Sequence, residues 1–385
     1  MLTSSKYDIA IVGMMLSSHG GGMPRSMAQQ AKIMSSNGHK VSLYIGDSSR
    51  MPFTPDQFYL GEHIDIYVSR SIGFWGFGII PKTLYMLYKN AKNHDIIHLN
   101  GVWNFTTFFG AIISYIKKVP AIISCRSHYG DYHFTRRPIL KKILFFTMEK
   151  INLKCVYGLH ITSDWEKETS WRAVKKAKNI IKIPNPVDLT DFNNPSLRNQ
   201  SRIKLGLDES MFYVIHLGRT AKQKNLSILI NSFSNCNFND DAKLLLIGPP
   251  EEDEKRKLIR LAKKLGVNKN IIFIDFAKGS ERCDWLSAAD IFALPSYDDN
   301  FCIVAIEAAA SGTLCLTSPF VGAIEYLPSS LIKICPLIQK EWDDSIKYHY
   351  DNRPQQNIMK EQISYQFSDD MLEKKWCEQY SKMGL

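Results

Sequence analysis

Apolar residues occur along the chain in short runs separated by longer amphipathic stretches. Several runs are unbroken Ile, Val and Leu, which is typical of parallel strands that helices cover on both faces. In the first half we expect strands at residues 7–14, 40–45, 64–68, 96–99, 121–124 and 158–162. Helical periodicity fills the intervals, most clearly at residues 23–36 and 139–153. This alternation predicts repeated strand–helix–strand units.

The second half repeats the alternation. We expect strands at residues 213–217, 243–248, 271–275, 291–295 and 313–318, and helices at residues 226–234, 251–265, 280–288 and 303–310. Two such arrays in tandem predict an α/β protein with two doubly wound, Rossmann-like parallel sheets. Ligands of these sheets bind beyond the carboxyl ends of the strands, so the expected site is a central cleft between two facing sheets.

Chain length and two prolines predict the domain boundaries. The 385 residues exceed the usual size of a single core. Pro184 and Pro186 cannot continue a helix or a central strand, and a polar stretch follows them. We expect a first domain over residues 1–188, a linker over 189–204, a second domain over 205–365 and a terminal helix over 366–385. That helix carries one apolar stripe with which it would pack back on the first domain, formed by Leu372, Trp376 and Tyr380.

The net charge of +10 is unevenly distributed. Residues 1–185 contain 24 Lys and Arg against 11 Asp and Glu, whereas the remaining 200 residues contain 24 against 27. This asymmetry predicts an anionic partner for the first half only. No nucleic-acid-binding signature is present, so we expect anionic lipid headgroups and no nucleic acid.

Cysteine usage indicates a reducing compartment. The eight cysteines form no CxxC pair, so neither a zinc site nor a disulfide framework is predicted, and we expect a cytoplasmic protein. No stretch reaches the roughly 18 consecutive apolar residues of a membrane-spanning helix. The run at residues 9–16 is short and follows Asp8, so it reads as a buried strand and not as a secretory signal.

Two loops carry features of anion binding. Gly20, Gly21 and Gly22 lie between the first strand and a helix, where they would form either a phosphate- or sugar-approach loop or an ordinary turn. Arg219 and Lys224 follow the strand at 213–217 and precede a helix. An isolated pair of this kind is often a solvated basic turn, but this placement favours a clamp on a diphosphate that leaves during a transfer reaction.

A third loop, between the strand at 291–295 and the helix at 303–310, contributes carboxylates. Asp299 ends this loop, and Glu307 lies among apolar residues of the helix. A buried carboxylate needs a partner, which would be either a ribose diol or a loop backbone that it caps. One short acidic stretch is weak support for a metal site, and we propose none.

Together these segments resemble the GT-B glycosyltransferases of family 4, a retaining and metal-independent group. The family's Glu-x7-Glu pair is matched by Asp299 and Glu307, and its GR…KG loop by residues 218–225. Four further family motifs are matched in the right order: DiiHlHgvW by residues 95–103, haTSexE by 161–166, PNGVD by 184–188, and AcGxPV…GGxxE by 310–314 with 321–325. The resemblance covers nearly the whole chain.

The resemblance implies a role for each matched residue. Arg219 and Lys224 would hold the diphosphate of a UDP- or GDP-sugar, Glu307 the ribose, and Asp299 the transferred sugar. The neighbouring donor-site residues would be Phe301, Cys302 and Ile303, with Gly20, Gly21 and Gly22 contributed by the other domain. The leaving phosphate oxygen would assist the acceptor hydroxyl, so neither a protein nucleophile nor a cofactor is implied.

This sequence departs from the family pattern at three positions. Asp299 replaces the first Glu, Cys302 a glycine and Pro186 the glycine of PNGVD. The family's sugar-site histidine also has two counterparts here. Relatives with Ser-Pro-Arg-Gly at this point align Arg126, whereas His128 is our preferred contact to a sugar hydroxyl.

The acceptor is expected on the basic first domain. The segment at 136–146 combines four cations, Arg136, Arg137, Lys141 and Lys142, with an apolar face. It would either lie on the anionic cytoplasmic face of an inner membrane or pack on its own sheet with the lysines outside. We expect that the segment lies on the membrane and that Arg126 is also on the acceptor side. The expected acceptor is a lipid-linked glycan of bacterial surface-polysaccharide synthesis. The alternative functions are a sugar-nucleotide epimerase of the same fold and an inactive partner that only binds sugar nucleotides.

Overall fold

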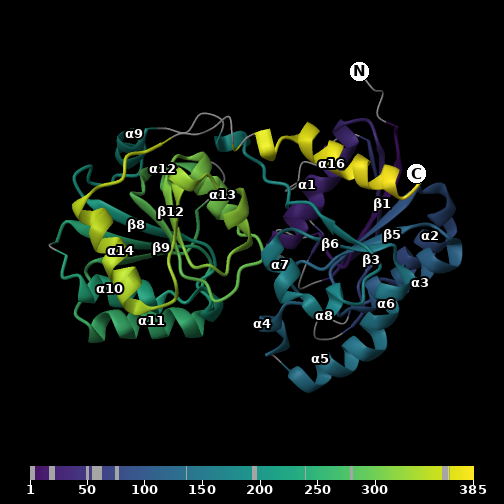
Figure 1. The fold of residues 1–385 in the computed structure, drawn as a ribbon, viewed down its shortest axis with the longest axis horizontal. Coiled ribbons are helices and arrows are strands. Elements are labelled where there is room, and N and C mark those ends of the chain that lie inside the picture. Colours follow the sequence, from purple (N-terminus) through teal and green to yellow (C-terminus); the bar gives the residue numbers. More distant parts are fainter. Residues whose placement is uncertain are drawn as a thin grey trace. The chain divides into compact units, whose positions relative to one another are not determined.

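The chain folds into two compact units in the computed structural model. The first comprises Met1–Val187 with Phe367–Leu385, and the second comprises Asp188–Gln366 (Figure 1). The structure describes residues 5–16, 22–48, 52–53, 63–73, 78–135, 137–192, 197–238, 240–277, 281–357, 363 and 365–385. The predicted site residues Gly20, Gly21 and Arg136 lie outside the described residues.

The first unit contains a seven-stranded parallel sheet in the order β3-β2-β1-β4-β5-β6-β7. Its strands are β1 (Asp8–Gly13), β2 (Lys40–Asp47), β3 (Ile64–Arg70), β4 (Ile96–Asn100), β5 (Ala121–Ser124), β6 (Gly158–Ile161) and β7 (Ile180–Lys182). The direction of winding changes between β1 and β4, and the carboxyl ends of strands at such a switch point are where ligands of doubly wound sheets bind.

Helices cover both faces of this sheet. They include α1 (Gly22–Ser36), α2 (Pro81–Asn90), α3 (Phe105–Lys117), α4 (Asp131–Phe134), α6 (Lys150–Cys155), α7 (Asp164–Thr169) and α8 (Trp171–Val174). Alternate residues of β1 point to opposite faces, so Ile9 and Ile11 enter one core with Met27 of α1, while Ala10 and Val12 enter the other with Leu84 of α2. Burial on both faces explains the continuous apolar runs.

The terminal helix α16 (Asp369–Lys382) belongs to the first unit. Its stripe of Leu372, Trp376 and Tyr380 is buried in the core that also contains α1. The Tyr380 hydroxyl lies 2.8 Å from Nε2 of His98 on β4, which ties the helix to the middle of the sheet. The last residues of the chain therefore complete the core of the unit in which the chain begins.

The second unit has a six-stranded parallel sheet in the order β10-β9-β8-β11-β12-β13. The strands are β8 (Phe212–Leu217), β9 (Ala242–Ile247), β10 (Ile271–Ile274), β11 (Ile291–Leu294), β12 (Leu314–Thr317) and β13 (Ile332–Ile334). Its helices include α10 (Ser227–Asn235), α11 (Glu252–Lys264), α12 (Glu281–Ala288), α13 (Ile303–Ala310) and α14 (Gln339–Asp351). The switch point lies between β8 and β11, directly before the two loops with candidate chemistry.

The polar stretch that we expected as a linker over 189–204 is partly a structured element of the second unit. Helix α9 (Arg198–Lys204) buries Arg202, whose Nη2 lies 2.7 Å from Oδ2 of Asp290 and whose Nε donates to the Ala288 carbonyl at 3.0 Å. Residues 198–204 thus form a helix of the second unit, and Arg202 is paired inside that unit.

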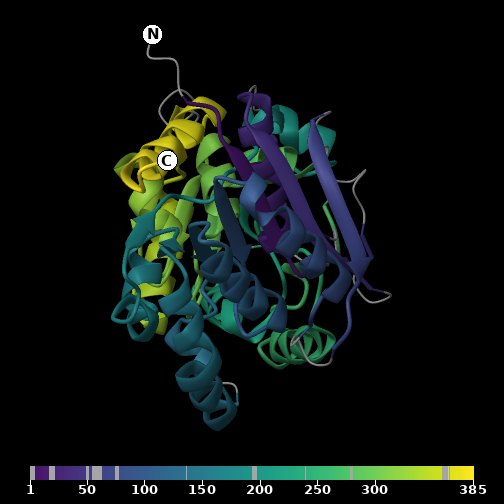
Figure 2. The same cartoon turned by 90° about the vertical axis from the view of Figure 1, so that its right-hand side faces the viewer.

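Helix α5 (Pro138–Leu144) differs from the other helices of the first unit because none of its residues is buried. A π-helical turn, Phe145–Glu149, joins it to α6. In both views α5 projects from the lower edge of the unit (Figure 1, Figure 2). No helix within the described ranges is both long and apolar enough to cross a bilayer.

Candidate active site

The Arg219–Lys224 loop leaves the carboxyl end of β8 at the switch point of the second unit. A side chain at Gly248 would collide with the backbone carbonyl of Gly218, so the approach of these two loops requires glycine. Arg219 is exposed, with Nη1 3.4 Å from Oε1 of Glu251. Lys224 is half-buried at the end of a 3₁₀ turn and forms an ion pair with Asp299.

Asp299 is fixed in the loop between β11 and α13. Its backbone N–H donates to the Phe320 carbonyl at 2.8 Å, and its own carbonyl accepts from Gly322 N–H at 3.0 Å. Burial alone would lower the pKa of Lys224, but the Asp299 carboxylate outweighs that effect and leaves the pKa raised. Lys224 is therefore a cation at any physiological pH, as diphosphate binding requires.

Glu307 on α13 is 3% exposed and has a protein partner, the guanidinium of Arg282 on α12. The sequence predicts a ribose diol or a loop backbone as the partner of this carboxylate and gives no sign of Arg282. No motif marks Arg282, and only the general rule that a buried carboxylate needs a cation could have pointed to it. A ribose at Glu307 would have to share the carboxylate with this arginine or displace it.

The residues between Asp299 and α13 form the wall of this loop. Phe301 is 2% exposed, and its ring lies 5.4 Å from that of Tyr326. Cys302 has φ of 60°, in the left-handed region that favours glycine over other residues. Burial raises the pKa of the Cys302 thiol, so it stays protonated. Ile303 is the first residue of α13.

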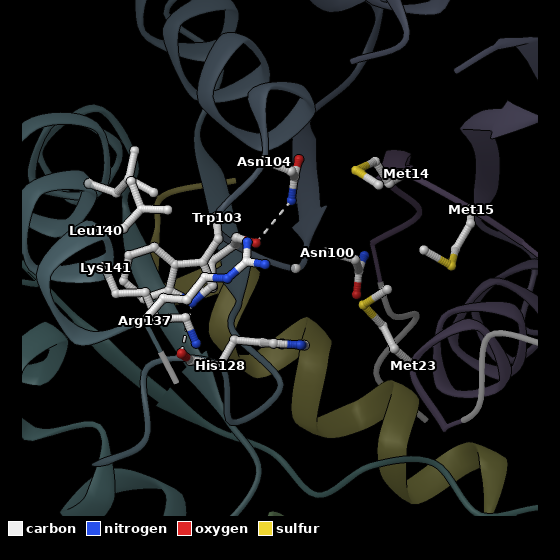
Figure 3. Close-up of a pocket in the computed structure, with 13 residues that line it drawn as sticks. Met14, Met15, Met23, Asn100, Trp103, Asn104, His128, Arg137, Leu140 and Lys141 are labelled. Atoms are coloured by element: carbon white, nitrogen blue, oxygen red, sulfur yellow. Dashed lines mark hydrogen bonds between the residues drawn. The ribbon is translucent and has the colours of Figure 1, made fainter. Parts of the chain in front are cut away.

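A cavity of about 360 Å³ lies in the first unit, at the carboxyl ends of β1 and β4. Its lining residues are Met14, Met15, Met23, Asn100, Gly101, Val102, Trp103, Asn104, His128, Arg137, Leu140, Lys141 and Leu144. Figure 3 shows Met14, Met15 and Met23 on one side of it and Trp103, Arg137, Leu140 and Lys141 on the other. Gly22 begins α1 immediately before Met23.

Trp103 is held in the cavity wall by a buried carboxylate. Its φ of 61° is left-handed, and its backbone N–H donates to Oε1 of Glu149 at 2.8 Å. The same carboxylate accepts from the Tyr129 hydroxyl at 2.6 Å and from the Asn152 amide at 2.8 Å. Glu149 ends the π-helical turn, a rare geometry that is enriched at functional sites.

The structure separates the two candidates for the sugar site. His128 lines the cavity, whereas Arg126 is 8% exposed, does not line it, and donates to Asn185 and, at 3.3 Å, to Oδ1 of Asn100. We expected Arg126 on the acceptor or membrane side, and in the structure its guanidinium is enclosed by these partners. Arg137 and Lys141 line the cavity, and Lys142 is exposed outside it.

The state of His128 follows from its surroundings. Burial lowers the pKa of the imidazole, so the ring is neutral at neutral pH. Nδ1 lies 3.0 Å from the Cys125 carbonyl oxygen, which can only accept, so the ring proton is on Nδ1. Nε2 is then a hydrogen-bond acceptor, as a contact to a sugar hydroxyl requires.

One group of side chains in the described part of the chain has the composition of a metal site, namely His39, Glu373 and Cys377. Nδ1 of His39 accepts from the Tyr7 N–H at 3.1 Å, so Nε2 bears the ring proton and donates to Glu373 at 2.9 Å. A metal at Nε2 would need this nitrogen without its proton. The cluster therefore serves to attach α16.

Two family models match the chain in succession. Residues 20–191 match "Glycosyltransferase Family 4", and residues 198–362 match "Glycosyl transferases group 1". The D-inositol 3-phosphate glycosyltransferase of Nocardia farcinica is 31% identical over 146 residues, which are 36% of this chain and 32% of that protein. The match thus spans about a third of the length of this relative.

Solved structures resemble the whole chain. Anabaena HepE, crystallised with UDP and glucose, has a TM-score of 0.73 and 18% identity, with 98% of this chain and all of that chain (100%) covered. The lipopolysaccharide outer core galactosyltransferase WaaB, in its apo form, has a TM-score of 0.68 and 17% identity at the same coverage. With its two parallel-sheet units and both family models matched, the chain belongs to the group 1 and family 4 glycosyltransferases and has the GT-B fold.

Proposed function

We propose that the protein transfers a sugar from a UDP- or GDP-sugar to a lipid-linked or saccharide acceptor, with retention of configuration and without a metal or cofactor. The observation that carries this proposal is the second unit's switch-point site. There Asp299 keeps Lys224 cationic, and Arg219 lies in the same loop as Lys224. Glu307 is on α13, the helix that follows the loop of Asp299. These groups provide charge for a diphosphate and a carboxylate for a ribose.

Donor binding is an exchange of partners in this proposal. The exposed Arg219–Glu251 contact at 3.4 Å is weak, so the arginine can turn to a diphosphate at little cost. The diphosphate also competes with Asp299 for Lys224. Asp299 is then available to accept a hydrogen bond from the transferred sugar. Its side chain is one methylene shorter than the family's glutamate, which limits how far it reaches.

The proposed transfer step requires no protein nucleophile. The bond between the anomeric carbon and the diphosphate oxygen breaks while the acceptor oxygen forms the new glycosidic bond on the same face. The proton of the acceptor hydroxyl passes to the leaving phosphate oxygen. Arg219 and Lys224 stabilise the negative charge that develops on that diphosphate.

We further propose that the acceptor belongs to bacterial surface-polysaccharide synthesis and that α5 attaches the protein to the cytoplasmic face of the inner membrane. Ile139 is 76% exposed and Ile143 57%, on a helix with no buried residue that also carries Lys141 and Lys142 and directly follows Arg137. An apolar face flanked by cations matches an anionic bilayer. The likeness to WaaB supports a lipopolysaccharide-type acceptor.

A donor panel tests the activity. The purified protein is incubated with UDP- and GDP-sugars, with and without bacterial membrane extract, and released nucleotide is measured together with the sugar product. We expect membrane-dependent release from one donor, unaffected by a chelator. Nucleotide binding without release under every condition would instead support the inactive partner, and conversion of the donor sugar without transfer would support the epimerase.

Liposome flotation tests the membrane proposal. We expect binding to vesicles of phosphatidylglycerol and phosphatidylcholine, and loss of binding in the variant Ile139→Glu/Ile143→Glu. The matched control is Ile203→Glu/Ile338→Glu, because these isoleucines of the second unit are 65% and 58% exposed. Equal flotation of both variants, or no flotation of the wild type, would refute attachment through α5.

A further inference from the structure

Building on the proposed function, we propose that Glu149 is a positioning residue of the transfer reaction. It would hold the loop of His128 through Trp103 and Tyr129, so that Nε2 of His128 faces the cavity and accepts a hydrogen bond from a sugar hydroxyl. The strained backbone around His128, the hydrogen bonds that Glu149 accepts and the π-helical turn that Glu149 ends support this role.

The backbone around His128 is strained at three residues that are not glycine. Arg126 and Ser127, directly before His128, have φ of 51° and 68°. Trp103, whose indole Nε1–H donates to the His128 carbonyl at 2.8 Å, has φ of 61°. Residues other than glycine stay in this left-handed region only where their surroundings hold them, and such strain is concentrated at functional sites. Its concentration beside a histidine of the cavity lining indicates a functional position for that histidine.

Glu149 holds His128 from two sides. Its Oε1 accepts from the backbone N–H of Trp103 at 2.8 Å, and the indole of Trp103 in turn donates to the His128 carbonyl. Its Oε2 accepts from the hydroxyl of Tyr129 at 2.6 Å, and Tyr129 is the next residue after His128 in the chain. One carboxyl group is therefore linked to the backbone of His128 through a side chain that bonds to it and through its own neighbour.

The ring of His128 depends on this arrangement for its orientation. Its Nδ1 donates to the Cys125 carbonyl at 3.0 Å, within the same loop, so a shift of the loop would break this bond. Glu166 fixes the strained residue between them by accepting from the Ser127 N–H at 2.5 Å. With the Nδ1 bond intact, Nε2 carries the lone pair, and the ring points across the cavity toward Met23 (Figure 3).

The hydrogen bonds of Glu149 show which variants would preserve the arrangement. Trp103, Tyr129 and, at 2.8 Å, Asn152 all donate to it, and its side chain is fully buried. Glutamine would keep one oxygen for the Trp103 N–H. Its NH₂ group could donate to Oδ1 of Asn152, which has no partner among the described residues, after that amide turns. Glutamine therefore preserves part of the arrangement, whereas alanine removes all of it.

The π-helical turn allows one helical segment to reach both the cavity and this buried position. Leu140 and Leu144 of α5 line the cavity, whereas Glu149 ends the turn and is buried beside Trp103 and Tyr129. The extra residue of a π turn shifts the residues after it by about 100° around the axis, relative to a continuous α-helix. This rare geometry thus gives Glu149 a direction that an unbroken helix would not.

Steady-state kinetics of nucleotide release test the role, with the donor that the panel identifies and a fixed amount of membrane extract. Glu149→Ala should lower the maximal rate about 10- to 100-fold, because a small displacement of a group that contacts the reacting sugar has effects of this size. The KM for the donor should change less than about threefold, since the proposed diphosphate and ribose contacts lie in the second unit. Glu149→Gln should recover the rate to within about fivefold of the wild type, because it keeps the bond to Trp103.

The matched control is Glu373→Ala. Glu373 is another buried carboxylate of the first unit, but it lies 2.9 Å from His39 and attaches α16. This variant should keep the maximal rate within about twofold of the wild type, because it leaves the loop of His128 intact. An equal fall in the two alanine variants, or a folded Glu149→Gln no faster than Glu149→Ala, would show that Glu149 only stabilises the unit and would overturn the assignment.

NMR of the full-length protein labelled with ¹⁵N-histidine tests the same claim without turnover. The His128 signals are identified by their loss in His128→Gln. We expect the Nδ1–H tautomer alone in the wild type and a mixture of tautomers in Glu149→Ala and in Tyr129→Phe. Tyr129→Phe removes one bond to Glu149 and keeps the ring, so it decides the case if Glu149→Ala does not fold. Unchanged His128 signals in Tyr129→Phe and in folded Glu149→Ala would overturn the assignment, and this outcome is distinguishable from failure of the proposed transferase activity.

Discussion

The two candidate ligand sites of the molecule differ in the charged residues that form them. In the second unit each cation of interest already has a carboxylate: Arg219 with Glu251, Lys224 with Asp299, and Arg282 with Glu307. The cavity of the first unit has Arg137 and Lys141 but no lining carboxylate. The cations of the second unit's site are paired with carboxylates, whereas the lining of the first unit's cavity contains two cations and no carboxylate.

The ion pairs of the second unit have a consequence for the binding of a donor. At the second unit a diphosphate must replace existing partners, so the gain in binding energy is modest until charge develops in the transition state.

The largest expected effect comes from breaking the neutralised site at Lys224. We expect Lys224→Met to lower the rate of nucleotide release about 100- to 1000-fold, since it removes a cation aimed at the leaving diphosphate. Lys222→Met, an exposed lysine in the same loop, is the control and should change the rate less than threefold. Similar rates for the two variants would show that Lys224 does not act on the leaving diphosphate.

Acid should separate the two units by stability. Burial lowers the pKa of His98 and His160 in the first unit to about 3, and that of His216 in the second to about 4. Below the ordinary histidine pKa of about 6.5, these histidines bind protons in the unfolded chain but not in the native state. The free energy of unfolding therefore falls as the pH falls. At pH 5.5 the loss is about 1.4 kcal/mol for each such histidine, hence about 3 kcal/mol in the first unit.

Urea unfolding at pH 7.5 and 5.5, followed by pulse-labelling hydrogen exchange at one common pH, resolves the units. A greater loss in the second unit than in the first would contradict the assignment of neutral buried histidines. The pH range of this effect runs from the ordinary histidine pKa to the pKa of the buried ring. The contribution of His216 to the free energy of unfolding should therefore decline from about pH 6.5 down to about pH 4.

Arg282 tests whether the Glu307 partner is structural. Arg282→Ala leaves a carboxylate that is 3% exposed without its guanidinium, and we expect a loss of about 2 kcal/mol in the unfolding free energy of the second unit. Arg260→Ala, an exposed arginine of α11, is the matched control. Equal stability of the two variants in urea unfolding would mean that the Arg282–Glu307 pair contributes nothing.

The smallest expected effect concerns Asp299. Asp299→Asn should lower the rate about tenfold and move the alkaline limb of the pH–rate profile to lower pH, because burial then lowers the pKa of Lys224 without a carboxylate to oppose it. Asp299→Glu restores the family residue and should keep the rate within about threefold. An unchanged alkaline limb in Asp299→Asn would show that Asp299 does not raise the pKa of Lys224.

Much of the fold was predictable because strands buried on both faces are long apolar runs. Strands β7 and β13 were missed, and each is only three residues long, too short for a periodic pattern. The predicted helix at 139–153 is in fact α5, a π-helical turn and α6. No composition rule distinguishes a π turn from an α-helix.

The candidate site was predictable where motifs carry it. Asp299, Lys224 and Glu307 were identified from their loops, but the pairing of Lys224 with Asp299 joins residues 75 positions apart. Arg282 lies in no motif. The cavity was not predicted, because Met14, Met23 and Leu140 are ordinary core residues by type, and only the fold shows that they surround a space.

The most direct measurement of the central claim, that the second unit grips a diphosphate through Arg219 and Lys224, is the affinity for a nucleotide series. Uridine, UMP and UDP, and their guanosine counterparts, are titrated calorimetrically into the wild type and Lys224→Met. We expect one base series to bind, with the diphosphate at least tenfold tighter than the nucleoside, and this preference to vanish in Lys224→Met. Equal affinity for nucleoside and diphosphate in the wild type, or a preference that survives the substitution, would contradict the claim.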